Sequence, residues 1–510
     1  MSAPNQKLAA SLAHLHKLQR GGVRVFESKQ FKRLDRDRLL KNGFLQEVIK
    51  GWLISSSPAT IDGDSTPWYA SFWEFCARYC HSRFGSDWYL SPEQSLLLFA
   101  ENTVAPVQVV VVSPKGNNHT LQLPSGTTLY DLKESQPLLE SDCVEKDSLR
   151  LIGVEAALVR VQEKFFETNP IEVRSALASI KDPSGLLTRL LEGGRSTIAG
   201  RVAGALRDMD RASFADEIVK TMKSAGYDVR ESNPFINTAT KTKLVAGSSP
   251  IASRLHELWQ ATRQSVIEVF PQSDGLAADR EAYLRAVEDV YRVDAYHSLS
   301  IEGYNVSMEL IEQVESGKWN PERIEADRQQ RDALAARGYW QAFQIVKSDV
   351  GQIVSGVDAG KLVARSHRDW YRELFQPCVV AGILQISALA GYRNHAVYLR
   401  NSRHIPPRWE AVRDAMPTLF ELIESEPSAA VRAVLGHWLF GYIHPYPDGN
   451  GRIARFLMNT MLASGGYPWT VIRLEDRGAY LEALEHASVA SDIRPFAKFI
   501  AESMRRSSVR

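Results

Sequence analysis

Apolar residues occur at helical spacing from about residue 252 onward. A first apolar face is formed by Leu255, Leu258, Trp259, Val266 and Phe270. Similar faces run along 431–442 and 453–461. A period near 3.6 residues places such side chains on one side of a helix. The pattern predicts a mainly α domain at 250–505, with a domain break near Gly247–Pro250.

The segment 392–407 interrupts the helical pattern. Val397 and Leu399 lie two residues apart, and Pro406 and Pro407 end the segment. Alternation indicates an extended backbone, and proline cannot continue a strand ladder. We therefore expect a small β-hairpin inserted between helices.

The region 76–246 has a mixed pattern. The runs Val107–Val112 and Thr120–Leu123 are short and bounded by turn residues, which predicts two strands. Gly193–Gly204 is rich in glycine but lacks the Gly-Lys-Ser/Thr ending of a phosphate-binding loop, so we interpret its small residues as helix contacts. An α/β domain is expected here, and the sequence assigns it no role.

Three short helices and a ribbon are predicted in residues 1–75. Leu8, Leu12, Leu15 and Leu18 have helical spacing, a second helix follows Ser28, and a third covers Asp35–Lys41. Leu45–Ile54 forms the ribbon, which completes the outline of a winged helix-turn-helix. Residues 1–50 hold eleven Lys or Arg against four Asp or Glu. Such an excess suits contact with DNA phosphates and also suits a solvated basic face.

The composition adds limits rather than an identity. A chain of 510 residues is expected to contain two to four domains. The formal net charge of +1 gives the whole chain no bias toward nucleic acid or membrane. No apolar run is long enough to span a membrane, and the first thirty residues lack a secretory signal. The four cysteines fit neither a zinc site nor a disulfide framework, so a reducing cytoplasm is expected.

The richest chemistry is predicted where the helix 431–443 ends. His444 precedes a proline, which disfavours helical geometry, and a loop with two glycines leads to a new helix near Arg452. Glycine lets the backbone approach a ligand closely, and the N-terminal end of a helix attracts anions. Arg452 and Arg455 project on one side, Asp448 is a hard ligand suited to Mg²⁺, and His444 can accept a proton. Together these groups indicate phosphoryl chemistry.

The twelve residues 444–455, His-Pro-Tyr-Pro-Asp-Gly-Asn-Gly-Arg-Ile-Ala-Arg, resemble the Fic signature His-Pro-Phe-x-Asp/Glu-Gly-Asn-Gly-Arg-x-x-Arg. Tyr446 replaces the phenylalanine and keeps an aromatic ring. The resemblance covers about 250–505 and implies a helical Fic domain that transfers AMP from ATP to a Ser, Thr or Tyr hydroxyl of a target protein. It also implies that 392–407 is the flap that pairs with the target's backbone.

The resemblance assigns a role to each matched residue. It implies that His444 is the general base and that Asp448 holds Mg²⁺ on the α- and β-phosphates. The cradle for the phosphates would be Gly449, Asn450 and Gly451. Arg452 would bind the β-phosphate of ATP, and Arg455 the γ-phosphate.

A second motif precedes the signature. Ser298-Leu299-Ser300-Ile301-Glu302-Gly303 resembles the family's inhibitory motif, Ser/Thr-x-x-x-Glu-Gly/Asn. Ser298 and Glu302 lie four residues apart and therefore share a helical face. The resemblance implies that Glu302 pairs with Arg455 and keeps it from the γ-phosphate. An autoinhibited enzyme is expected.

Other interpretations stay open. Three stretches, Phe31–Leu34, Leu39–Gly43 and Val48–Trp52, faintly resemble the winged-helix start of AbiEi-type antitoxins. The chain is thus an enzyme, a DNA-binding regulator whose Fic domain serves as a sensor or toxin partner, or both. Glu302 is also suited to position a water that removes AMP from a modified protein. UMP or phosphocholine as the transferred group and a homo-oligomer are not excluded.

Overall fold

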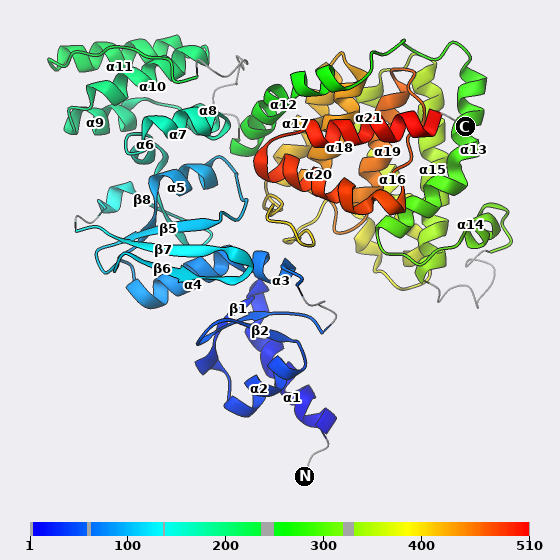
Figure 1. Cartoon of the computed structure of the whole chain (residues 1–510), viewed down its shortest axis with the longest axis horizontal. Coiled ribbons are helices and arrows are strands. Elements are labelled where there is room, and N and C mark those ends of the chain that lie inside the picture. Colours follow the sequence, from blue (N-terminus) through cyan, green and yellow to red (C-terminus); the bar gives the residue numbers. More distant parts are fainter. Residues whose placement is uncertain (1–3, 59–62, 136–137, 236–248, 320–330, 509–510) are drawn as a thin grey trace. The chain divides into compact units, whose positions relative to one another are not determined.

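The computed structural model describes residues 4–58, 63–135, 138–235, 249–319 and 331–508. It is mainly helical, with small sheets in its N-terminal half (Figure 1). The chain divides into two compact units: one holds residues 1–250 together with 398–405, and the other holds 251–397 and 406–510. The break predicted near Gly247–Pro250 lies partly outside the described residues, and helix α12 begins at Pro250.

The N-terminal part of the first unit combines two helices with an antiparallel sheet of order β1-β3-β2. A small core forms from Leu15, Phe26, Phe31, Leu39, Leu45 and Leu53. The first and third predicted helices and the ribbon are present, whereas the segment after Ser28 is a single 3-10 turn, Ser28–Gln30. A reciprocal cap between Glu27 and Gln30 closes that turn. The elements are α1 (Pro4–Leu18), β1 (Val25–Glu27), α2 (Arg33–Lys41), β2 (Leu45–Ile49) and β3 (Trp52–Ser55).

The rest of this unit is a four-stranded sheet, a β-hairpin and a group of helices. The sheet has the order β4-β5-β7-β6, with β5 and β7 parallel, and the hairpin pairs β8 with β9. The strands predicted at Val107–Val112 and Thr120–Leu123 are confirmed, and they correspond to β5 and β6. The elements are α3 (Thr66–Tyr69), α4 (Phe72–Phe84), β4 (Tyr89–Leu90), α5 (Pro92–Phe99), β5 (Gln108–Ser113), β6 (His119–Gln122), β7 (Thr128–Lys133), β8 (Cys143–Lys146), β9 (Leu149–Ile152), α6 (Val154–Leu158), α7 (Glu163–Thr168), α8 (Pro170–Ser179), α9 (Ser184–Glu192), α10 (Ser196–Asp208) and α11 (Ala212–Ser224).

The glycines of α10 serve a close backbone contact. A Cβ at Gly200 would lie 2.0 Å from the carbonyl oxygen of Arg230, and one at Gly204 would lie 2.0 Å from that of Ser232. The interpretation of this glycine-rich segment as a helix contact is therefore confirmed.

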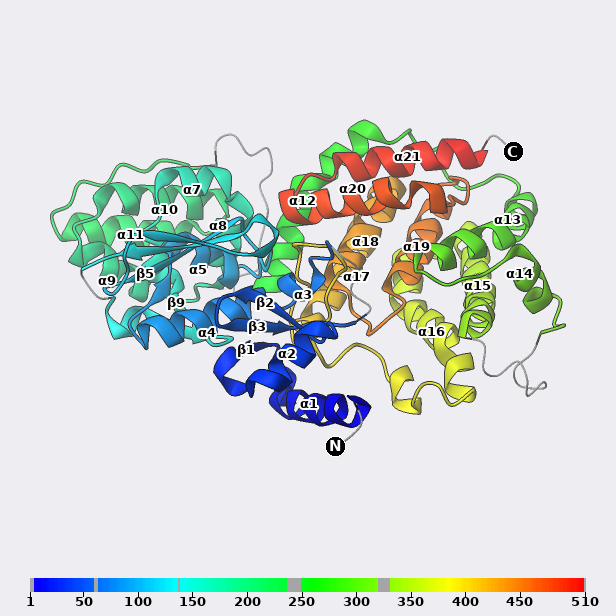
Figure 2. The same ribbon diagram turned by 60° about the horizontal axis from the view of Figure 1, so that its bottom comes forward.

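The second unit is a helical bundle. Helices α18 and α19 are buried along most of their length, because α18 is apolar nearly all round and α19 packs against it, α15 and α16. Figure 2 shows α20 and α21 side by side on the outside of this bundle. The elements are α12 (Pro250–Val269), α13 (Arg280–Ile301), α14 (Met308–Glu315), α15 (Arg331–Val354), α16 (Ala359–Val380), α17 (Val412–Ser425), α18 (Ala429–Ile443), α19 (Asn450–Ala463), α20 (Arg477–Ala490) and α21 (Arg494–Ser508).

The β-hairpin predicted at 392–407 is wrong, because this segment contains no strand. Its backbone polar groups find partners outside any ladder. Within the first unit, the N–H of Ala105 donates to the carbonyl of Arg403 at 2.9 Å. Within the second, the N–H of Arg393 donates to the carbonyl of Pro445 at 2.9 Å. Two neighbouring prolines, at 406 and 407, have no N–H to donate and further prevent a ladder.

Among the helices within the described residues, none is both long enough and apolar enough to cross a membrane.

Candidate functional site

The loop between α18 and α19 has a backbone that its sequence explains. His444 ends α18 in the left-handed region, at φ 50°, and the proline after it disfavours continuation of the helix. Gly449 takes φ 79° just before α19. The Asn450 side chain closes the loop from inside: its Oδ1 accepts from the N–H of Tyr446 at 2.9 Å, and its Nδ2 donates to the Tyr446 carbonyl at 2.8 Å. The side chain of Asn450 thus shapes the cradle as well as lying in it.

The imidazole of His444 is arranged to accept a proton. Its Nδ1 lies 3.3 Å from the carbonyl oxygen of Gly441. Because a carbonyl oxygen can only accept, Nδ1 carries the proton and Nε2 keeps its lone pair. Burial, aided by the nearby Arg393 guanidinium, lowers the pKa of His444 to about 4. The ring is therefore neutral, and its free nitrogen can act as a base near neutral pH.

Asp448 presents its carboxylate to solvent at the mouth of the loop. Its side chain is 59% exposed and lies 3.6 Å from a guanidinium nitrogen of Arg452. Its Oδ1 accepts from the N–H of Gly449 at 2.6 Å. In the part of the chain that is described, no three acidic, histidine or cysteine side chains gather as a metal-binding group. A single exposed carboxylate fits Mg²⁺ that takes its remaining ligands from water and nucleotide phosphates.

Arg452 is a buried cation with unused donors. It is 1% exposed, and its guanidinium carbon lies 5.2 Å from the ring centre of Tyr304 and 5.1 Å from that of Phe375. Its Nε and one terminal nitrogen have no hydrogen-bond partner. Buried donors left unpaired are costly, so this arrangement suits an anion that would accept from them.

Arg455 is also buried, but the chain itself occupies most of its donors. Its Nε donates to the Ser298 hydroxyl at 2.9 Å, and its Nη2 donates to the Ser298 carbonyl at 2.9 Å. The same Nη2 donates to Oε1 of Glu302 at 2.8 Å. Its Nη1 has no partner. The two residues of the second sequence motif are therefore brought together on this one guanidinium.

The carboxylate of Glu302 lies directly against the N-terminal end of α19. A Cβ at Gly451 would lie 2.1 Å from Oε1 of Glu302, so glycine is required there for the carboxylate to fit. Burial opposes ionisation of Glu302, but Arg455 and Arg452 outweigh it, and its pKa lies below the usual value. Glu302 thus stands as an anion, 29% exposed, where the helix end and both arginines would receive a phosphate.

Aromatic side chains support the loop from below. The ring of Tyr446 stacks on Tyr371 with centres 3.9 Å apart and an interplanar angle of 8°, which shows how tyrosine replaces the signature's phenylalanine. His437 is a core residue whose ring nitrogens both have partners, the Ala454 carbonyl at 3.0 Å and the Tyr480 hydroxyl at 2.8 Å. Sequence reasoning missed Tyr371, because only the fold brings α16 beneath the loop.

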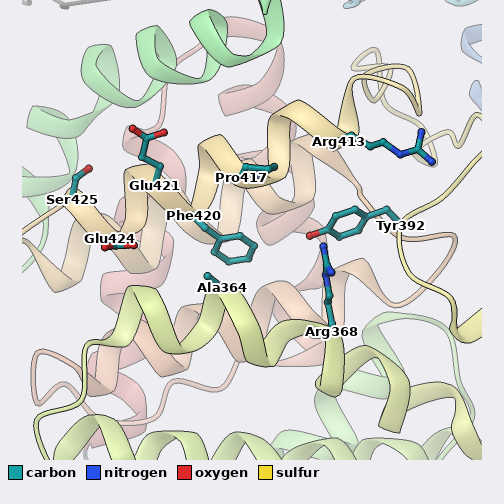
Figure 3. Close-up of a pocket in the computed structure, with 9 residues that line it drawn as sticks. All are labelled: Ala364, Arg368, Tyr392, Arg413, Pro417, Phe420, Glu421, Glu424 and Ser425. Atoms are coloured by element: carbon teal, nitrogen blue, oxygen red, sulfur yellow. The ribbon is translucent and has the colours of Figure 1, made fainter. Parts of the chain in front are cut away.

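A separate cavity of about 820 Å³ lies between α16 and α17 (Figure 3). Arg368 and Tyr392 lie at one end of it, where the guanidinium carbon is 5.1 Å from the ring centre. The Tyr392 hydroxyl contacts Nε2 of His367 at 2.9 Å. The cavity is not lined by any residue of the 444–455 loop and helix, so it is distinct from the site described above.

Comparisons with known proteins match the part of the chain that contains this site. Residues 363–462 match the Fic/DOC family. A protein adenylyltransferase Fic from Nematostella vectensis is 29% identical over 227 residues, which cover 44% of this chain and 49% of the relative. One from Culex quinquefasciatus is 30% identical over 228 residues, or 44% of this chain and 42% of the relative. A solved Fic domain containing signaling protein from Bacteroides thetaiotaomicron aligns at 18% identity with a TM-score of 0.35, over 50% of this chain and 93% of its own.

These similarities concern one part of the molecule. The aligned segment spans less than half the length of the curated relatives. The family match begins within α16 and ends within α19, so it includes the loop with His444, Asp448 and both arginines. The second unit of this chain therefore contains a Fic domain, within the matched residues 363–462.

Proposed function

We propose that the chain is an autoinhibited protein adenylyltransferase, which transfers AMP from ATP to a hydroxyl of a target protein or of itself. The observation that carries the proposal is the occupied guanidinium of Arg455, next to the unpaired donors of Arg452. The relatives named protein adenylyltransferase Fic support the type of reaction. The role of each site residue, the inhibition and the nature of the target are our inferences.

In this mechanism, the backbone N–H groups at Gly449–Gly451 and the guanidinium of Arg452 hold the phosphates of ATP. The target hydroxyl oxygen attacks the α-phosphorus, and the bond from that phosphorus to the bridging oxygen breaks. Pyrophosphate leaves, and the hydroxyl proton passes to Nε2 of His444, which is free and neutral. Asp448 would hold Mg²⁺, which neutralises phosphate charge when bound. The target would dock along 392–407.

Inhibition follows from competition for Arg455. A guanidinium that donates to a carboxylate cannot donate the same N–H groups to a γ-phosphate, and charge-assisted bonds of this type are strong. The negative charge of Glu302 also repels a phosphate from the helix end. Activation would therefore require Glu302 to leave Arg455. As the alternative function, the same carboxylate would orient a water that removes AMP from a modified protein.

The direct test is mass spectrometry of the intact chain, and of a cell lysate, after incubation with MgATP. The wild-type chain and the Glu302→Gly variant are compared, with UTP as a second donor. Addition of AMP by the variant would support the proposal. Addition of UMP instead would show that UTP is the donor. If no protein gained an adduct, the proposed transferase activity would be rejected.

A second function is favoured by a basic groove in the first unit. Four cationic residues and one acidic residue line a cavity of about 410 Å³ around α1 and α2, namely Lys7, Lys32, Arg33, Arg38 and Asp35. Leu34 is exposed there at 75%. We propose that residues 1–75 are a winged helix-turn-helix that binds duplex DNA, because clustered cations attract phosphates.

The prediction of a reducing cytoplasm also stays a proposal, supported by the four free cysteines.

A further inference from the structure

Arg393 joins several main-chain segments of the second unit through one buried guanidinium. It is 1% exposed, and it follows Tyr392 at the start of the non-helical segment. Its side chain donates to four carbonyl oxygens: His444 from Nε at 2.8 Å, His395 from Nη1 at 3.1 Å, Ile443 from Nη2 at 3.3 Å, and Pro407, also from Nη2. All four acceptors are main-chain carbonyls, so these bonds fix the position of the backbone.

Two of the four acceptors belong to the C-terminal end of α18. The last carbonyls of a helix have no partner within it, and a cation there is stabilising. The His444 carbonyl is one of these, and this residue turns into the left-handed region at φ 50°. A left-handed conformation is unfavourable for a non-glycine residue. Hydrogen bonds from Arg393 therefore hold the backbone that carries the catalytic imidazole.

The other two acceptors mark the ends of the segment 395–407. The guanidinium reaches the carbonyl of His395 at one end and that of Pro407 at the other. The main-chain N–H of Arg393 adds a bond to Pro445, one residue after His444. One residue thus connects both ends of this segment to the loop that contains the base.

We propose that Arg393 is a positioning residue for the transfer reaction, which sets the backbone of His444 and the two ends of 395–407 in fixed relation. A target hydroxyl presented by the two ends of this segment that lie in the second unit, 395–397 and 406–407, would then meet Nε2 of His444 at the right place. The inference rests on the proposed adenylyltransferase function. None of the four acceptors belongs to a residue assigned to the phosphates, so we expect nucleotide binding not to depend on Arg393.

The test uses Arg393→Met and Arg393→Lys in the full-length Glu302→Gly chain. Arg413→Met is the matched control, because this exposed arginine packs on Trp409 in the same unit. Three quantities are measured: MgATP affinity by calorimetry, the single-turnover rate of automodification at saturating MgATP, and hydrogen exchange of peptides covering 393–397 and 443–448. Lysine has three donors on one atom and cannot reach four carbonyls.

The proposal predicts that Arg393→Met binds MgATP as its parent does and modifies itself roughly 10²-fold more slowly, because small misplacements of reacting groups cost about that much. Arg393→Lys should recover part of the rate, and exchange should rise only in the two peptides. An unchanged rate would overturn the proposal, and so would equal losses of rate and MgATP affinity with faster exchange throughout the unit. If the Glu302→Gly parent transfers nothing, the proposed function fails, and local exchange in the two peptides alone decides whether Arg393 holds them.

Discussion

Arg455 donates a hydrogen bond to Glu302 across 2.8 Å, although the two residues lie 153 positions apart in the chain. Ser298, one turn before Glu302, accepts two more bonds from the same guanidinium. The two sequence motifs, at 298–303 and 444–455, thus meet on a single side chain. The arginine is 3% exposed, so displacing the carboxylate without offering another anion would leave a buried charge unpaired. In the proposed reaction, the γ-phosphate of ATP is that other anion.

The pairing predicts a specific pattern for combined substitutions. Glu302→Gly should raise activity, and adding Arg455→Ala should return it to a low level, because the released arginine is then missing. Ser298→Ala should raise activity more weakly than Glu302→Gly, since the Ser298 carbonyl still accepts from Arg455. The rate of automodification with labelled ATP is measured for the wild-type chain and for these three variants. High activity in the chain with both Glu302→Gly and Arg455→Ala would show that inhibition does not act by keeping Arg455 from the γ-phosphate.

His444→Ala should lower transfer roughly 10²–10⁴-fold while the chain stays folded, which is the usual effect of losing a general base. His81→Ala is the control, an exposed histidine of the first unit. The low pKa of His444, about 4, keeps the imidazole neutral. The fall of the rate at acidic pH should therefore be centred well below the ordinary pKa of histidine. The charge of Glu302 raises the pKa of His444, so removing Glu302 should shift this fall to still lower pH. A fall centred at the ordinary value would contradict the assigned base.

Asp448→Asn should weaken ATP binding in the presence of Mg²⁺ and leave metal-free binding nearly unchanged, because an amide oxygen is a poorer ligand for a hard cation than a carboxylate. Calorimetry in the Glu302→Gly background, with Mg²⁺ and then with a chelator, separates the two. Asp476→Asn is the control, since that carboxylate pairs with Arg506 at 2.7 Å away from the loop. An identical response to Mg²⁺ in both variants would remove Asp448 from the metal site.

Local chemistry explains what could be predicted from the sequence. The proline after His444 and the glycine before Asn450 act on their own neighbourhood, so the turn between α18 and α19 follows from residue types alone. The helices of the second unit follow equally from apolar spacing. The prediction at 392–407 failed because an alternating pattern cannot say whether a strand partner exists.

Long-range contacts account for the parts of the site that were missed. The acceptors of Arg393 are backbone carbonyls, which are the same in every residue type and leave no trace in a sequence. The rings of Tyr304, in a loop, and Phe375, in α16, pack on the guanidinium of Arg452, although both residues lie more than seventy positions away in the sequence. Only the pair of Glu302 with Arg455 was foreseen at such distance, because the resemblance to a family carried it.

The basic groove of the first unit makes a prediction about salt. The full-length chain should bind duplex DNA weakly, with affinity that falls steeply as salt rises. Replacing Lys32 and Arg33 together by alanine should lower the slope of log affinity against log salt by about 2, because two fewer phosphates are neutralised. Gel mobility shifts over a salt series measure it. Absence of binding at low salt, or an unchanged slope, would exclude DNA as a ligand of this groove.

The pairing of Glu302 with Arg455 is proposed to restrain an otherwise complete adenylyltransferase site. The decisive measurement is the rate at which wild-type and Glu302→Gly chains incorporate labelled AMP, over a series of MgATP concentrations. A charge-assisted hydrogen bond contributes about 1.5–3 kcal/mol, so autoinhibition through this pair predicts a rate roughly ten- to hundred-fold higher for the variant. Equal rates at every MgATP concentration would refute autoinhibition, and Ser298–Gly303 would then be only the end of a helix.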